Sequence, residues 1–518
     1  MKCSQKGCKS LGNKNAYFKY IVIFVSGIIL AIFVLGKIRA DFKKCMGISF
    51  ITEEEIQQIA FSRQELDNIV TLENHLLPYD QNKREIYIPC NVTAKTKFYE
   101  LEGQLQSILP EYELYFVWDG FFDALSEAIK YGCRFALLAV DSQGNFTTYG
   151  VVFTTLPVFE MHGDVIGIDE REREVNYGKV TVWNPNYQDS GKLSVQDSAV
   201  EWHVRGFSSQ SAPKKSLKLN LKDKQGEQNN CSFLGFDSDD DYLLNAMWCD
   251  DIKIREKLVM DLWNQMAELE NSSLKMTNGE YCELIINEEY QGLRLLQNKM
   301  ERSYLKLGED DILLKGNNVN VGTQKPPQEV YEVEYSKQNE TVTYQTIGEF
   351  FYQSDFSNVA LESWVDLQLF LHFGNMVDNE GYKNIFYVVE RSNGQETLRF
   401  IPWDTDMSFG IYFNDGFKYD PGVVENISYR TEYLKILETY PEIETMLSLR
   451  WKELRETIFT EENIFSRIDE YTARVTDSGA LKRDFDYLGW NTWGGEDTID
   501  NFKLFIQERL RILDKLYQ

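Results

Sequence analysis

The chain has 518 residues, of which 43% are hydrophobic and 26% are charged, a balance typical of a folded protein with several domains. Its 54 Lys and Arg face 81 Asp and Glu, which gives a formal net charge of −27. This acidic balance argues against nucleic acid as a partner, because phosphate binding needs a basic face. The four His residues form no HExxH pattern, which argues against a His-based zinc hydrolase.

An apolar stretch lies near the N-terminus at 20–36, and no charged residue interrupts it. Its length is at the short end for a membrane-spanning helix, and Lys residues stand on both sides. A cleaved signal peptide is the alternative, but no A-x-A site follows the run. We therefore expect a short tail at 1–19, a transmembrane signal anchor at 20–36, and a single-pass membrane protein whose body lies outside the cytoplasm.

Residues 45–146 are predicted to form a small juxtamembrane α/β module. Thr52 and Glu55 have the spacing of a capping box, which predicts a helix over 52–72. Short strand-like runs and a helix near 121–131 follow. The Cys residues after the anchor could form disulfides or remain buried thiols, and their spacing does not decide between the two.

From about 147 the pattern changes to alternating strands. In 216–222, Leu alternates with polar and cationic residues, which predicts a strand with one apolar and one cationic face. Helices are then predicted at 250–269 and 358–374, with one hairpin at 282–298 and a second that runs from 377–390 to 398–410. The last 75 or so residues are predicted to be mostly helical. The sequence thus predicts an α+β domain over 147–518, with an antiparallel sheet in one lobe and a helical second lobe, and a ligand cleft between them.

The first cluster with chemical potential contains Arg205, Ser208 and Ser209, followed by Lys215 and Lys218 on the predicted strand. A Gly turn with two hydroxyl groups and nearby cations suits a phosphate chain, because backbone N–H groups and hydroxyls donate while Arg and Lys neutralise charge. The alternative is an ordinary basic turn that leads into a strand. No Walker A sequence is present.

Two further clusters carry carboxylates. Asp378 and Asn384 stand on a loop that enters a strand, where a carboxylate can accept a hydroxyl proton and an amide oxygen can bind magnesium. Asp404 and Asp406 face the same way in an extended chain, and neighbouring carboxylates repel each other unless a cation lies between them. The sequence therefore predicts a magnesium site, with an Asx-capped turn and a solvated turn as the structural alternatives.

Taken in order, five blocks of the sequence resemble the CotH kinase family, the atypical protein kinases named after a spore coat protein. The blocks are RGFSSQSAPKKSLKLNL, DDDYLLNAMWCDDIKIREKLVMDLW, ELIINEEYQGLRLLQNKM, VDNEGYKNIFYV and IPWDTDMSFG. They extend from about 150 to 420, and the resemblance extends to the C-terminus if the helical part is included. Glu288 stands in the hairpin where the family pattern has Gly.

The resemblance implies a reduced, two-lobed protein-kinase-like fold and a magnesium-dependent transfer of the ATP γ-phosphate to Ser or Thr of a protein substrate. By position, Asp378 would be the catalytic carboxylate. The residues that would hold magnesium are Asn384, Asp404 and Asp406. The residues that would meet the phosphates are Arg205, Ser208, Ser209 and one of Lys215 and Lys218. Glu256, on the helix that follows, is expected to pair with Lys218.

Two other functions stay open. Because ATP is scarce outside the cytoplasm, the chain could be a catalytically silent surface interaction or adhesion protein on a kinase-like scaffold. It could also be a metal-dependent hydrolase built on the Asp cluster. The intact set of Asp378, Asn384, Asp404 and Asp406 favours the kinase over the adhesin. The absence of a Ser, Cys or His nucleophile constellation counts against the hydrolase.

Overall fold

The chain forms two compact units, Met1–Phe153 and Thr154–Gln518, in a computed structural model. The residues that the structure describes are 36–37, 39–92, 103–117, 125–133, 135–166, 174–187, 192–206, 208–317, 326–352, 356–379, 383–412, 416–422, 436, 438–489 and 497–517. The predicted tail and anchor lie outside this part, apart from Gly36. Among the described residues, no helix is both long enough and apolar enough to span a membrane.

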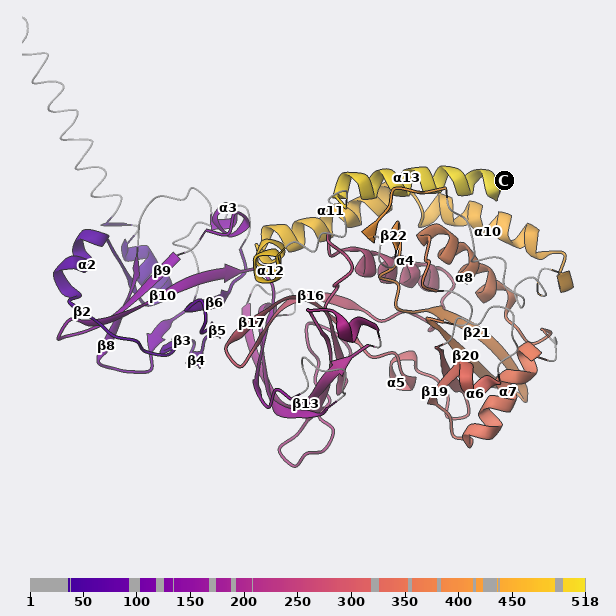
Figure 1. Cartoon of the computed structure of the whole chain (residues 1–518), viewed down its shortest axis with the longest axis horizontal. Helices are drawn as coiled ribbons and strands as arrows, with labels where there is room; N and C mark the ends of the chain where they lie inside the picture. The colour runs from indigo at the N-terminus through magenta and orange to yellow at the C-terminus, as the bar shows by residue number, and fades with distance from the viewer. Residues whose placement is uncertain are drawn as a thin grey trace, which may run out of the picture. The chain divides into compact units, whose positions relative to one another are not determined.

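The first unit contains a seven-stranded sheet, a three-stranded sheet and short helices (Figure 1). The larger sheet has the order β1 (Ser49–Ile51), β8 (Tyr112–Val117), β9 (Phe135–Asp141), β10 (Asn145–Thr154), β6 (Glu85–Pro89) and β5 (Tyr79–Asp80), with β2 (Ser62–Arg63) beside β10. The smaller sheet joins β4 (His75–Leu76), β3 (Val70–Leu72) and β7 (Leu105–Ser107), and the helices include α2 (Glu53–Ile59) and α3 (Leu125–Lys130). The predicted domain boundary at 146 falls inside β10.

The capping box at Thr52 is present, but the helix that it starts is shorter than predicted. Thr52 Oγ1 accepts a hydrogen bond from the Glu55 amide at 3.3 Å, and Glu55 Oε2 accepts one from the Thr52 amide at 2.9 Å. The helix α2 ends at Ile59, and residues 62–63 and 70–72 form strands. The prediction of one helix over 52–72 is therefore wrong, because all three residues of β3 are buried between strand neighbours instead of lining a helix face.

The second unit begins with a closed barrel. Its strand order is β11 (Val158–Gly163), β12 (Asn176–Tyr187), β13 (Lys192–Arg205), β14 (Ser216–Lys222), β15 (Asp241–Asn245), β17 (Glu289–Asn298) and β16 (Gly279–Ile286). All ladders are antiparallel except the one between β11 and β16, which closes the barrel. The predicted alternation in β14 is confirmed, because Leu217, Leu219 and Leu221 are buried in the barrel core beside Trp202.

The hairpin of β16 and β17 keeps a tight two-residue turn although Glu288 replaces the family's Gly. Asn287 and Glu288 both have positive φ, at 45° and 62°, as a type I′ turn requires. The side-chain amide of Asn287 also bonds to the backbone of Gly163 in both directions, at 3.0 and 2.9 Å. This contact with β11 compensates for the strained conformation of the turn.

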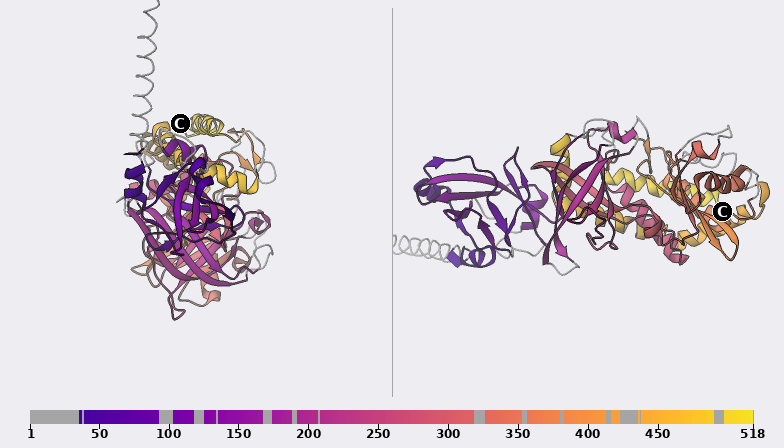
Figure 2. Two further views of the ribbon diagram at one scale, coloured as in Figure 1. Left: turned by 90° about the vertical axis from the view of Figure 1, so that its left-hand side faces the viewer. Right: turned by 90° about the horizontal axis from the view of Figure 1, so that it is seen from below.

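The rest of the second unit is a four-stranded sheet with helices. The sheet has the order β19 (Tyr331–Tyr335), β18 (Ile312–Gly316), β20 (Ile385–Ser392) and β21 (Gln395–Pro402), and a short hairpin joins β22 (Ile411–Tyr412) to β23 (Gly416–Phe417). The helices of this unit include α4 (Arg255–Leu269), α7 (Glu340–Tyr352), α8 (Leu361–Gly374), α10 (Ile443–Thr457), α11 (Glu461–Asp477), α12 (Ala480–Leu488) and α13 (Ile499–Leu516). In Figures 1 and 2, barrel and sheet are separate bodies of this unit, and α10, α11 and α13 lie along one side.

The architecture confirms the predicted α+β class, with a mostly antiparallel sheet first and a more helical half after it. Among the described Cys residues, Cys45, Cys133, Cys231, Cys249 and Cys282 have free thiols. The thiol of Cys282 is buried, as in one of the two possibilities that the sequence left open, and the side chain of Cys90 is buried as well.

Candidate active site

Asp378 and Asn384 lie together on the loop between α8 and β20. The helix α8 ends at Gly374, and Asn375 follows it in the left-handed conformation that often ends a helix. Asn384 has a φ of 58° immediately before β20, and its Nδ2 donates to Asp378 Oδ2 at 2.9 Å. Lys383 Nζ pairs with the other carboxylate oxygen of Asp378. The spacing of six residues therefore does place this carboxylate and this amide at one point.

Asp404 and Asp406 follow β21 and face the same region. Asp404 has a φ of 53° and an exposed side chain, while the side chain of Asp406 is half-buried. Burial raises the pKa of Asp406 well above its ordinary value, and the negative charges of Asp404, Glu256 and Asp378 raise it further. The pKa of Asp378 is also raised, chiefly by burial, against the opposing effect of Lys383. The four carboxylates are thus close enough to repel one another.

Glu256 joins this cluster from the first turn of α4. Its two carboxylate oxygens accept hydrogen bonds from Gln297 Nε2 and Asn245 Nδ2, each at 2.7 Å. Burial raises the pKa of Glu256 to about 7, and the nearby Asp404 adds to this rise. The side chain is only 7% exposed. Glu256 is therefore a buried acid close to Asp404 and Asp406.

Lys218 does not pair with Glu256 in this structure. Its Nζ lies 3.3 Å from Asp241 Oδ2, and Lys299 approaches the same oxygen at 3.1 Å. Lys218 stands on the outer face of β14, and Asp241 begins the neighbouring strand β15, so Asp241 is the nearer carboxylate. This arrangement corrects the expected contact: Glu256 is held instead by the amides of Asn245 and Gln297.

Of the predicted phosphate-binding residues, Arg205 lies nearest to the carboxylates. Its guanidinium is 5.9 Å from the centroid of the Trp403 ring, and its charge lowers the pKa of Glu256. Ser208 and Ser209 lie in the 3₁₀ turn Ser208–Ser211 that follows. Lys215 Nζ donates to the carbonyl of Gln210 at 2.7 Å, so it turns back onto its own loop. The structure thus joins Arg205 to the acidic cluster and gives Lys215 and Lys218 other partners.

A buried amide that the sequence analysis did not single out holds the two halves of the site together. Asn379 Nδ2 donates to the carbonyl oxygens of Asn384 and Trp403, each at 2.8 Å. The amide of Trp403 in turn donates to the carbonyl of Asn384 at 2.9 Å. The loop that carries Asp378 is therefore tied to the segment that carries Asp404. The position of Asn379 directly after Asp378 was the available signal.

A second missed feature is a buried ion pair beneath the 206–215 loop. Lys214 Nζ lies 2.6 Å from Asp484 Oδ1 on α12, and the two side chains are 0% and 2% exposed. The same oxygen accepts the amide of Leu293 at 2.9 Å. A Cβ at Gly292 would lie 2.2 Å from it, and the φ of Gly292 is +87°. Gly is therefore required in this part of β17 because the Asp484 carboxylate packs against the backbone.

Arg255 fixes the start of α4 in a similar way. Its fully buried guanidinium binds Asp250 and, at 3.0 Å from Nη1, Asp497. It also lies over the Phe502 ring of α13, 4.7 Å from the centroid. Because Glu256 directly follows Arg255, the ion pairs of Arg255 help to orient the buried carboxylic acid of Glu256. Asp497 and Phe502, which are more than 200 positions away in the sequence, thus help to hold the start of α4 and with it Glu256.

The donor set suits a hard divalent cation. Four carboxylates lie near one another, with Arg205 and Lys383 as neighbouring cations, so the region favours added positive charge. In the part of the chain that the structure describes, no three His, Cys, Asp or Glu side chains already form a metal-binding group. Magnesium does not require one, because it commonly takes one or two carboxylates and completes its shell with phosphate oxygens and water. The residues therefore fit a magnesium ion that arrives with a nucleotide.

The raised pKa of Glu256 leads to a test without any ligand. The folded state keeps a proton that the unfolded state releases above its ordinary pKa of 4.5, so the stability from this proton is lost as pH rises through about 7. When the pH is raised from about 5.5 to 8.5, we expect the free energy of unfolding of the Glu256→Gln variant to rise by about 2 kcal/mol relative to that of the parent. Urea unfolding in EDTA measures this. An equal difference at both pH values, as expected for the exposed Glu470→Gln control, would contradict the assignment.

Comparison with known proteins adds one match. A family model described as CotH kinase protein matches residues 202–513. No curated protein matches the chain. The matched region contains each of the site residues from Arg205 to Asp406, together with Asp484 and Asp497.

Proposed function

The chain belongs to the CotH kinase protein family, and on this premise we propose that it is a magnesium-dependent kinase that transfers the γ-phosphate of ATP to Ser or Thr of a protein substrate. The observation that supports this most is the convergence of two separate segments, 378–384 and 404–406, on one acidic region tied together by Asn379. An ordinary solvated turn would not bring Asp378, Asp404 and Glu256, from three parts of the chain, close enough to raise the pKa of Asp406.

Each residue then has a defined task. Asp378 orients the substrate hydroxyl and accepts its proton, while Lys383 stabilises the carboxylate charge. Asn384, Asp404 and Asp406 would hold magnesium, which neutralises phosphate charge when it is bound. Arg205 and the N–H groups of the following turn meet the phosphates. Catalysis is then mainly positioning and charge neutralisation, with no covalent enzyme intermediate.

For the location of the protein, we propose a single N-terminal membrane anchor at 20–36 with the body outside the cytoplasm. The support is the uninterrupted apolar run between Lys19 and Lys37. Labelling of a Cys introduced at an exposed body position, such as Ser273, with a membrane-impermeant maleimide in intact cells tests the orientation. Labelling only after the cells are lysed would contradict it.

The proposed nucleotide site predicts magnesium-dependent binding of ATP. We expect calorimetry on the full chain to show ATP binding with magnesium and at least tenfold weaker binding in EDTA. The Asp404→Ala/Asp406→Ala variant is expected to lose the magnesium-dependent part, because it removes two of the oxygen ligands. The control Asp469→Ala/Asp477→Ala makes the same change of charge on α11. A folded parent that binds no ATP would overturn the kinase and favour the surface interaction protein.

A further inference from the structure

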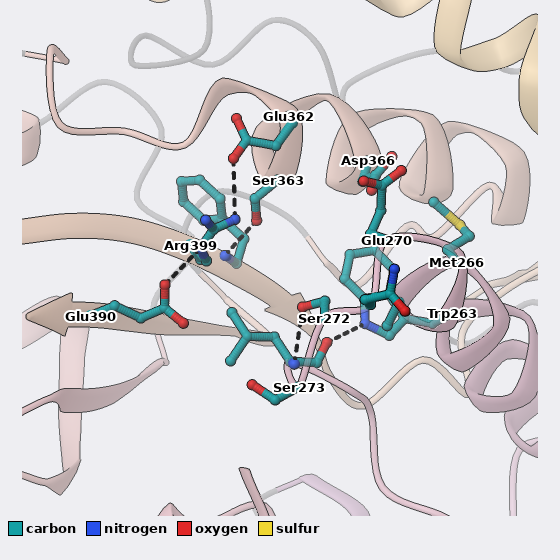
Figure 3. A pocket seen from close by; sticks show the side chains of 14 residues that line it. Trp263, Met266, Glu270, Ser272, Ser273, Glu362, Ser363, Asp366, Glu390 and Arg399 are labelled. Carbon is teal, nitrogen blue, oxygen red and sulfur yellow. Dashed lines mark hydrogen bonds and ion pairs between the residues drawn. The ribbon is translucent and has the colours of Figure 1, made fainter. Parts of the chain in front are cut away.

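A cavity of about 370 Å³ lies in the second unit, between α4, α8 and the sheet strands β20 and β21 (Figure 3). It is lined by the last turns of α4 and the segment 270–274, by the first turns of α8, and by Glu390, Arg399 and Phe400 on the strands. Its volume is within the range of roughly 300–1,000 Å³ that is usual for ligand sites. None of its lining residues belongs to the carboxylate cluster.

The cavity lies at the opposite ends of α4 and α8 from that cluster, and on β21 it lies five residues before Asp404. Glu256 opens α4, whereas Glu270 follows its last residue, and this is a separation of about 21 Å along a helix. The helix α8 has Glu362 in its first turn and leads at its other end to Asp378. The strand β21 carries Arg399 and leads to Asp404. The cavity is therefore a distinct site on the same framework.

Three apolar side chains lie at the base of the cavity, but most of its exposed lining is polar. Trp263, Met266 and Phe400 line it, and each is at most 5% exposed. The indole Nε1 of Trp263 donates to the carbonyl of Leu274 at 3.2 Å, so the remaining indole surface offers the cavity only hydrocarbon and π electrons. The small apolar surface that remains can contact part of the methylene stem of a long side chain, while the polar lining is left for its charged end.

The rim of the cavity is negative. Among the described residues that line it, Glu270, Glu362, Asp366 and Glu390 are carboxylates and Arg399 is the one cation. Figure 3 shows Arg399 between Glu362 and Glu390, at 3.2 and 2.8 Å. Behind the rim, Arg450 binds Asp366 and Glu270, each at 2.7 Å. Even with Arg450 counted, the carboxylates around the cavity outnumber the cations, so the cavity attracts positive charge.

We propose that this cavity binds a Lys or Arg side chain of a basic polypeptide segment. The cationic head meets the rim carboxylates, and the methylene stem lies on the floor formed by Trp263, Met266 and Phe400. The rim opens to solvent at Glu270 and Glu362, whose side chains are 47% and 62% exposed, so the peptide chain can continue out of the cavity. A segment of a polypeptide also fills more of the cavity's volume than a ligand the size of one side chain would. This binding does not depend on ATP or on phosphate transfer.

The test is fluorescence anisotropy with the full chain and a fluorescein-labelled peptide of alternating Gly and Arg, at 0.15 M salt and without nucleotide. We expect the Glu270→Gln/Glu362→Gln variant to bind about tenfold more weakly. Both positions are exposed, and Arg450 and Arg399 keep Asp366 and Glu390 as partners, so the fold is preserved. The control Glu470→Gln/Glu508→Gln removes two charges from exposed positions elsewhere. Equal weakening in both variants would mean unspecific attraction to an acidic protein and would overturn the proposal.

A second variant fills the cavity without changing its charge. Ser273→Trp places a large ring at the exposed part of the lining and is expected to weaken peptide binding at least tenfold. Unchanged binding would overturn the proposed site. Competition by spermine distinguishes a free polyamine from a cationic side chain of a polypeptide as the ligand of the cavity. If spermine displaces the peptide at an equal or lower concentration, the ligand is a free amine and not a polypeptide. Weaker competition by spermine supports the peptide.

Discussion

Phosphate transfer by the Asp378→Ala variant is expected to be about a hundred to ten thousand times slower than by the parent, with binding of ATP and magnesium changed less than about threefold. Asp378 is the carboxylate that Lys383 and Asn384 hold in place, whereas Asp404 and Asp406 are the residues that we propose as the main magnesium ligands. Removing Asp378 therefore removes the proton acceptor and leaves the nucleotide ligands. Transfer of radioactive γ-phosphate to a mixture of Ser- and Thr-containing peptides measures the first effect, and calorimetry measures the second.

A matched control separates the role of the carboxylate from that of its shape. Asp378→Asn keeps the size of the side chain and one oxygen acceptor for Asn384 but cannot take the hydroxyl proton. It is expected to be nearly as slow as Asp378→Ala. Full activity of Asp378→Asn would mean that the residue only positions its neighbours, and equal loss of ATP binding in both variants would assign it to the nucleotide site.

The largest expected loss of stability comes from Asp484→Ala, at about 3–5 kcal/mol. The variant leaves Lys214, whose side chain is 0% exposed, without its carboxylate, and it also removes the acceptor of the Leu293 amide. Burial already lowers the pKa of Lys214 well below its ordinary value, which shows how costly its charge is in this place. Urea unfolding of the full chain, followed in the transition of the second unit, measures the loss.

The control for this variant is on the same helix. Asp486→Ala breaks an exposed pair with Lys482, whose members are about half exposed, and it is expected to cost less than about 1 kcal/mol. A double variant, Lys214→Met/Asp484→Leu, removes both members of this pair and is expected to recover part of the loss, because the buried Lys253, 3.7 Å from the other oxygen of Asp484, still loses its carboxylate. If Asp484→Ala and Asp486→Ala have similar effects, the buried pair does not stabilise the junction of α12 and the barrel.

Local patterns in the sequence predicted local structure well. The alternation of Leu in 216–222 had a period of two over seven residues, and this is enough to fix which face of β14 enters the barrel. The capping box at Thr52 correctly marked where α2 begins. It said nothing about where the helix ends, because strand pairing with β10 decides that, and strand pairing is not local.

The candidate site was predictable to the extent that its members are close in sequence. Asp378 and Asn384 are six residues apart, and one loop brings them together. The partner of Lys218 was not predictable, since Asp241 and Glu256 are both downstream carboxylates and only the order of the barrel strands selects Asp241. Asp484 and Asp497 had no local signal at all. Their roles depend on contacts with residues more than 200 positions away.

The long separation of Lys214 and Asp484 also sets an order of events on the ribosome. The two residues are 270 positions apart, so at roughly 5–20 residues per second the lysine is made about 14–54 s before its partner. During that interval the barrel strands β11–β17 can be complete while Lys214 and Arg255 still lack Asp484 and Asp497. The barrel therefore lacks both of these buried ion pairs until the chain has been made as far as Asp497.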